Sequence, residues 1–211
     1  SPYAKGRLSR RKNIVTDDFK YVKSTKPKGL PKVTIASPAV LHFWLGDASF
    51  NPEVFEDRAA FYDDLITVFR DEIADLADAG CQFMQLDDTA LPCNCDENAR
   101  AAIKARGEDA DELTVSYVEL INDCLSGKPK DMAIGLHMCR GNLKGMWMAE
   151  GGYEPIADVI FNNLKIDTFF LEYDTARAGD FKPLRFLPEG KTAVLGLLST
   201  KTPVLESKDE L

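Results

Sequence analysis

Three polar side chains stand at the ends of apolar runs, and their types suit a metal ion. His137 and Cys139 follow the run 132–136 and are two residues apart, so both point to one face of an extended backbone. An imidazole and a thiol together suit Zn²⁺ and other borderline metals. Glu172 closes the run 166–171. The three form a ligand set of the kind that holds zinc with one position open; the alternative for the His-Cys pair is packed core.

Other polar residues have both a functional and a structural interpretation. Asp87 and Asp88 end another apolar run, where they either join a site or cap the next helical turn. His42 follows the first predicted strand and is either a substrate contact or proton carrier, or a packed loop histidine. Cys93 and Cys95 have no second pair at zinc-finger spacing, so we interpret them as two loop thiols.

Composition narrows the class of protein. The chain has 211 residues, 45% hydrophobic and 28% charged, which is ordinary for a soluble globular protein. A formal charge of -8 argues against nucleic acid or an anionic membrane as partner. No apolar run approaches the roughly 20 residues of a membrane span. The odd number of cysteines, 5, indicates reduced thiols and a cytoplasmic setting.

Apolar β-branched runs alternate with segments of helical periodicity along most of the chain. We expect residues 1–31 to be irregular, because they are rich in Lys, Pro and Gly. Strands are predicted over 32–41, 81–88, 132–138, 166–173 and 192–198, and helices over 53–79, 96–105, 110–125, 153–164 and from 203 toward 211.

This alternation predicts an α/β fold. Near-continuous apolar strands joined by helices indicate a parallel sheet with both faces covered. Functional sites then lie at the carboxyl ends of the strands, both in (β/α)8 barrels and in open doubly wound sheets. No Gly-rich phosphate loop follows any strand, which argues against a doubly wound sheet that binds a dinucleotide. Five strands fall short of the eight in a closed barrel.

Three motifs carry a resemblance to a known family: Gln-Leu-Asp-Asp at 85–88, His-Met-Cys at 137–139 and Phe-Leu-Glu-Tyr-Asp at 170–174. The chain resembles the cobalamin-independent methionine synthases, in particular their shorter single-domain members, from about residue 30 onward. This implies a (β/α)8 TIM-barrel type of fold, present here as a partial barrel of about five parallel strands with helices.

The resemblance also implies a zinc cofactor and a reaction. The enzyme would transfer a methyl group from a folate-type donor to the thiol of homocysteine, giving methionine. His137, Cys139 and Glu172 would be metal ligands, and Asp87 would bind the amino group of homocysteine. The family's final cysteine ligand has no counterpart, since no cysteine follows Cys139. The stretch 197–201 also lacks the histidine of the family's Asp-x-His segment, so the methyl or alkyl donor could differ.

These departures lead us to expect an internal fragment of a longer protein, with residues 32–211 as a partial catalytic barrel that is inactive alone. An incomplete barrel has exposed sheet edges, so we expect a homodimer or capture of missing segments. Three alternatives remain open. They are another thiol alkyltransferase, a metal-free enzyme of the uroporphyrinogen decarboxylase type, and a degenerate non-catalytic binding protein. The decarboxylase type would require arginines at the barrel mouth to hold the carboxylates of its substrate.

Overall fold

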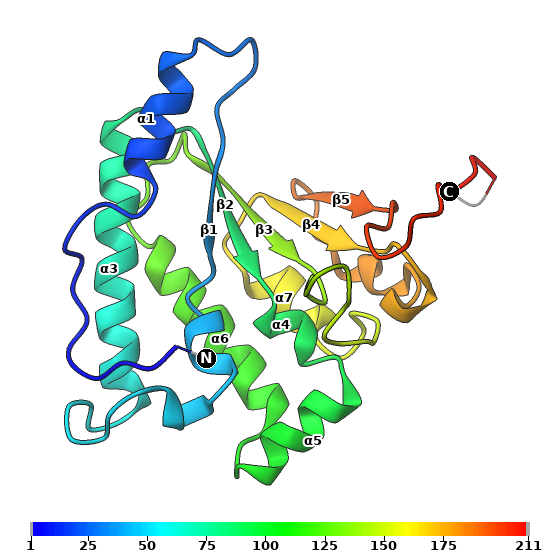
Figure 1. Ribbon diagram of the computed structural model, residues 1–211, viewed down its shortest axis with the longest axis horizontal. Coiled ribbons are helices and arrows are strands. Elements are labelled where there is room, and N and C mark those ends of the chain that lie inside the picture. Colours follow the sequence, from blue (N-terminus) through cyan, green and yellow to red (C-terminus); the bar gives the residue numbers. More distant parts are fainter. Residues whose placement is uncertain (1, 210–211) are drawn as a thin grey trace.

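The computed structural model describes residues 2–209, and its centre is a sheet of five parallel strands (Figure 1). The strands lie side by side in chain order, which is the arrangement of a barrel sheet; a doubly wound sheet reverses its order at a switch point. They are β1 (Val33–Ala36), β2 (Phe83–Asp88), β3 (Ala133–Met138), β4 (Thr168–Glu172) and β5 (Thr192–Gly196). The prediction of five parallel strands is confirmed.

The connecting helices begin where the sequence supplies a cap. Asp57, Asp96 and Asp109 each accept a hydrogen bond from a backbone amide of the helix that follows, at α3 (Arg58–Asp78), α5 (Glu97–Ala105) and α6 (Ala110–Leu125). α3 packs on α6, and α6 packs on α7 (Ala157–Asn163). Across residues 2–209, no helix combines the length and apolarity that crossing a bilayer requires. Short helical turns complete the chain: α2 (Val40–Phe43), η1 (Gly46–Ser49), α4 (Ala90–Cys93), η2 (Ala176–Ala178) and η3 (Lys182–Phe186).

The two faces of the sheet differ in burial. Residues of one face are fully buried against the helices, as Leu86, Leu136 and Phe169 show. Their neighbours in sequence point to the other face, where Asp87 is only half-buried and Phe170 is too. The prediction that both faces are covered is therefore wrong for the described residues. The half-covered face is the one that would line the interior of a closed barrel.

Four predicted elements differ from the structure by more than two residues. The helix expected over 53–79 begins at Arg58, where the Asp57 carboxylate caps it. The strand expected over 32–41 ends at Ala36, and Pro38 leads into the short helix α2. The helix expected from 153 starts at Ala157, because the buried Tyr153 hydroxyl donates to the carbonyl of Met138 at 2.7 Å and fixes the preceding loop. No helix forms over residues 203–209, where Glu206 instead accepts a hydrogen bond from the Ser199 amide at 2.7 Å; residues 210–211 lie outside the described part.

The N-terminal segment is also more ordered than we predicted. It forms α1 (Thr16–Ser24), which lies beside α3 in Figure 1 and buries Phe19. The cap of α1 comes from the neighbouring helix. The buried carboxylate of Glu72 in α3 accepts hydrogen bonds from the amides of Ile14 at 2.7 Å, Val15 at 2.9 Å and Thr16 at 3.0 Å. A cap supplied by tertiary contact leaves no local sequence pattern, which is why the segment looked irregular.

Replacing Glu72 with glutamine is expected to loosen the N-terminal segment and destabilise the fold by about 2 kcal/mol, since charge-assisted hydrogen bonds are lost from a buried site. Burial opposes ionisation, but the hydrogen bonds from Val15 and Ile14 outweigh it and lower the pKa of Glu72. Its contribution is thus complete above the ordinary carboxyl pKa of 4.5 and is lost as the pH falls through the lower native pKa. Hydrogen exchange of the α1 amides and urea unfolding measure both effects; equal protection in the parent and the variant would contradict them. The exposed neighbour variant Asp71→Asn is the control.

Candidate metal and substrate site

Strand register brings the predicted site residues to one row. Asp87 of β2 pairs with His137 of β3, which pairs with Phe170 of β4, which in turn pairs with Val194 of β5. Directly paired residues share a face of the sheet, so all four side chains point to the half-covered face near the strands' carboxyl ends. Asp88 points the opposite way and is fully buried. The alternation of side chains along β2 therefore puts Asp87 at the site and Asp88 in the core.

Asp87, His137 and Cys139 form a compact cluster. One ligand atom from each lies within 4.8 Å of the other two, and the His137 Nδ1 atom lies 2.5 Å from the Asp87 Oδ1 atom. The His137 and Asp87 side chains are 35% and 47% exposed, so the cluster opens to solvent. Imidazole nitrogen, thiol sulfur and carboxylate oxygen are all zinc ligands. The structure therefore brings the predicted His-Cys pair together, with Asp87 as its third neighbour.

The thiol of Cys139 is half-buried, and its surroundings favour the protonated form. Burial raises the pKa of Cys139, and the nearby carboxylates of Glu172 and Asp87 add to this, while a hydrogen bond from the Gly141 amide acts in the opposite direction. A bound cation would reverse this balance, because a coordinated thiol is deprotonated. The site thus has the ligand types for a cation, and the carboxylates of Glu172 and Asp87 lie near the thiol.

Glu172 lies beside the cluster but is held by basic groups. Its Oε2 atom accepts a hydrogen bond from the Arg140 backbone amide at 2.6 Å, and its Oε1 atom accepts one from the Arg177 guanidinium at 2.7 Å. The ammonium of Lys201 lies 3.8 Å from Oε1. Glu172 is 9% exposed, so its charge needs these partners. The structure puts it on the wall of the site, outside the three-residue cluster.

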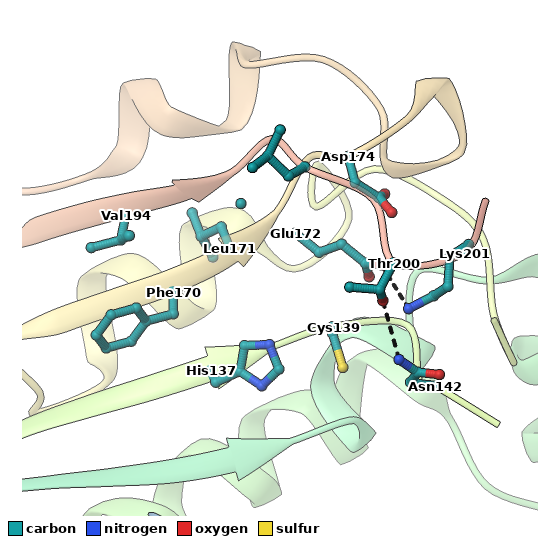
Figure 2. A pocket seen from close by; sticks show the side chains of 12 residues that line it. His137, Cys139, Asn142, Phe170, Leu171, Glu172, Asp174, Val194, Thr200 and Lys201 are labelled. Carbon is teal, nitrogen blue, oxygen red and sulfur yellow. Dashed lines mark hydrogen bonds and ion pairs between the residues drawn. The ribbon is translucent and has the colours of Figure 1, made fainter. Parts of the chain in front are cut away.

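A pocket of about 370 Å³ joins Glu172 to His137 and Cys139 (Figure 2). Its volume is within the range of small-molecule sites. The carboxyl ends of β3, β4 and β5 and the loops after them form its walls, and Asn142 donates a hydrogen bond to the Thr200 hydroxyl at 3.2 Å across its mouth. It is lined by His137, Cys139, Asn142, Phe170, Leu171, Glu172, Asp174, Val194, Gly196, Leu198, Thr200 and Lys201.

His42 is not brought to this pocket. The ring is fully buried at the carboxyl side of β1, with Nδ1 2.9 Å from the Tyr117 hydroxyl and Nε2 3.1 Å from the Asp47 carboxylate. Both ring nitrogens are thus occupied by the protein itself. The structure favours the packed alternative for this residue over the substrate contact.

The remaining candidates also have structural roles. Asp88 accepts a hydrogen bond from the Leu91 amide at 2.7 Å at the start of α4, and burial raises its pKa to about 6. Cys93 and Cys95 are buried thiols, and burial raises the pKa of each to about 12. A thiol that holds its proton so firmly is a poor nucleophile.

The buried ring of His42 is expected to resist protonation. Burial lowers the pKa of His42 below 6.5, although its hydrogen bond to Asp47 opposes this. Below pH 6.5 the unfolded chain therefore binds a proton that the native chain resists, and this residue's contribution to stability declines as the pH falls. NMR titration of the ring protons checks the shift, and a His137→Gln variant identifies the His42 signal. A His42 midpoint at or above 6.5 would contradict the burial argument.

Three basic residues of this site were given no role in it by sequence reasoning. Arg140, Arg177 and Lys201 surround Glu172, and all three side chains are almost completely buried. Arg177 follows Asp174 by three residues and pairs with it at 2.9 Å. That spacing is the one local hint; Lys201 comes 29 residues after its partner, and only the β4–β5 pairing brings them together.

The chain spans about half the length of the curated relatives it matches. It is 33% identical to the uncharacterized protein YxjH of Bacillus subtilis over 98% of this chain and 54% of that protein. It is 26% identical to the methionine synthase of Pyrococcus abyssi over 97% of this chain and 50% of that one. A Listeria monocytogenes structure assigned to the vitamin-B12-independent methionine synthases superposes with a TM-score of 0.75 and 32% identity, over 98% of this chain and 58% of that one.

The superposition confirms the predicted fold class, since five parallel strands in this order match part of that protein. A family model described as "Cobalamin-independent synthase, Catalytic domain" matches residues 8–211. This match includes most of the segment before β1, in agreement with the packing of α1 on α3. The chain therefore belongs to the family of cobalamin-independent synthase catalytic domains.

Proposed function

We propose that this chain is the zinc-binding part of a methyltransferase that moves a methyl group from a folate-type donor to the thiol of homocysteine, giving methionine. His137, Cys139 and Glu172 are the proposed metal ligands, and Asp87 is the proposed partner of the substrate amino group, with residues 32–211 as the catalytic domain. The observation that supports this most is the cluster of Asp87, His137 and Cys139 within 4.8 Å, at the carboxyl edge of a parallel sheet.

The residues present fit zinc by their chemistry. One imidazole, one thiol and a neighbouring carboxylate supply three protein ligands, the number found in catalytic zinc sites that keep a fourth position for substrate. Both Asp87 and Glu172 are available for the carboxylate position, with Asp87 nearer to the pair and Glu172 held at the pocket wall by Arg177. When bound, zinc lowers the pKa of a coordinated thiol, so that it reacts as a thiolate at neutral pH.

The chain's own residues would hold and orient the reactants. The Asp87 carboxylate, 47% exposed, can pair with a substrate ammonium beside the cluster. Phe170, Leu171 and Leu198 line the pocket with apolar surface, which limits water around the reacting sulfur and the methyl carbon. Holding the two in line removes much of the entropic cost of a bimolecular transfer.

A second candidate is a thiol alkyltransferase with another donor or acceptor. It is favoured by the 33% identity to an uncharacterized protein against 26% to a methionine synthase. A decarboxylase that holds acidic substrates with arginines is less well supported. Arg140 and Arg177 bond to protein groups around Glu172, and Arg185 pairs with Glu154 away from the pocket.

Metal content and thiol binding test this function on the chain itself. We expect close to one zinc per chain after purification without chelators. After exchange for Co²⁺, homocysteine should strengthen the sulfur-to-cobalt charge-transfer absorption, because a second thiolate joins that of Cys139. Binding of methyl-folate to the zinc-loaded chain would then separate the first candidate from the second. A protein that purifies without zinc, and whose cobalt absorption does not change with homocysteine, would contradict both candidate functions.

The two carboxylates give a matched pair of variants. If Glu172 is the ligand, Glu172→Gln should lower zinc affinity by at least roughly 10-fold, the lower limit for losing an outer partner of a ligand, whereas Asp87→Asn should mainly weaken homocysteine binding. The reverse pattern would assign the ligand role to Asp87. Competition with a chromogenic chelator measures the first effect, and the cobalt spectrum measures the second. No change in either variant would contradict both roles.

A further inference from the structure

The pocket contains one cation that the zinc site does not need. The side chain of Lys201 is 6% exposed, yet its one ion-pair partner within 4 Å among residues 2–209 is Glu172, at 3.8 Å. That distance is too long for a hydrogen bond. The Glu172 oxygen in question already accepts from Arg177 at 2.7 Å. A nearly buried ammonium without a close acceptor is costly, so this arrangement suits a ligand that supplies one.

The charges around Lys201 leave a positive excess on the pocket wall. The carboxylates of Glu172 and Asp174 face three cations, Arg140, Arg177 and Lys201. Arg177 pairs with both carboxylates, and the guanidinium of Arg140 donates to backbone carbonyls instead. Among these, Lys201 is the cation on the pocket lining.

The other acidic groups nearby do not cancel this excess. Glu206 accepts from the Ser199 amide at 2.7 Å and lines the neighbouring hollow beside Thr202 and Val204. Asp87 pairs with His137 at the opposite side of the site. Figure 2 shows the ammonium of Lys201 and the carboxylate of Glu172 turned toward one another.

We propose that Lys201 binds the acid group of the thiol substrate and so makes this site selective for thiols that carry a carboxylate. The molecule would place its sulfur at His137 and Cys139 and its anion at Lys201, with the carbon chain along Phe170 and Leu198. Thr200, tied to Asn142 at 3.2 Å, fixes the backbone immediately before Lys201. The placement of the sulfur in this inference rests on the proposed zinc chemistry. The binding of the anion depends on Lys201 alone.

The test compares three small probes by NMR titration: 3-mercaptopropionate, its neutral analogue 3-mercapto-1-propanol, and butyrate, which has no thiol. The parent should bind 3-mercaptopropionate roughly tenfold or more tightly than the alcohol, as expected for a charge-assisted contact in a shielded site. Lys201→Met should remove that preference, and Lys201→Arg should keep most of it. Lys130→Met, an exposed lysine at the opposite end of β3, is the control and should change nothing.

Butyrate on zinc-free protein separates this inference from the proposed function. If no zinc binds, the methyltransferase proposal fails, yet butyrate should still lose roughly tenfold affinity in Lys201→Met. Butyrate binding that is equal in parent and variant, or absent from the parent, overturns the role of Lys201. Thermal unfolding confirms that the variant is folded, and Lys201→Gln replaces it if the methionine form is not.

Discussion

Replacing Cys139 with alanine is expected to lower the zinc affinity of the chain by at least about 100-fold, more than the loss of an outer hydrogen-bond partner costs. Cys139 is the one thiol in the cluster with His137 and Asp87, and a thiolate is the strongest zinc ligand available there. Alanine leaves the imidazole of His137 and two carboxylates. That of Asp87 is open to solvent, and that of Glu172 is already paired with Arg177. His137→Ala should have a comparable effect.

Elemental analysis after dialysis, followed by chelator competition, measures this loss. The matched control is Cys124→Ala, which removes a buried thiol of α6 whose pKa burial raises to about 12. It should cost some stability through the small cavity it leaves but keep the zinc content of the parent. Zinc that stays with the chain in both the Cys139 and His137 variants would mean that the metal is held elsewhere.

Arg140→Met is expected to destabilise the fold by about 3–5 kcal/mol, because it removes a buried charge from among its partners. The guanidinium is fully buried and lies 4.2 Å from the Tyr153 ring centroid. It donates to the carbonyl of Gly151 at 2.6 Å and 2.9 Å and to that of Glu172 at 3.0 Å. Methionine fills similar space but leaves these buried acceptors without a donor, which is the costly case.

Urea unfolding compares Arg140→Met with Arg185→Met. Arg185 pairs with Glu154 at the surface, where both side chains are about half exposed, so its loss should leave the unfolding midpoint nearly unchanged. Because the Arg140 guanidinium also donates to the Glu172 carbonyl and lies 3.8 Å from the Glu172 carboxylate, residual folded Arg140→Met protein should bind zinc more weakly if Glu172 is a ligand. A shift no larger than that of Arg185→Met would show that the buried guanidinium is dispensable.

The sequence alone was sufficient for the order and type of most elements. The helix predicted over 110–125 has those bounds in the structure, because its apolar period and the Asp109 cap agree. The strands carrying Asp87, His137 and Glu172 were located because each is a short apolar run, and the parallel sheet followed from their alternation with helices. The His-x-Cys spacing also placed both side chains on one face, since a strand has a period of two.

Elements that depend on distant partners could not be predicted in this way. α1 is capped mainly by Glu72, 56 residues away from Thr16, because Val15 at the N-cap position provides no side-chain cap and Asn13 accepts only from the Asp17 amide, at 3.3 Å. His42 looked like a candidate at the mouth of the barrel, but only folding shows that Tyr117 and Asp47 occupy both its ring nitrogens.

The site itself was decided by register. Residue types determined that a His, a Cys and carboxylates stand at strand ends, but only the pairing of β2 with β3 puts Asp87 opposite His137 while Asp88 turns into the core. Only the pairing of β4 with β5 brings Lys201 to Glu172. Local propensity and periodicity act within a dozen residues, whereas neighbours across a parallel sheet are separated by whole helices, so the charges around the pocket depend on tertiary structure.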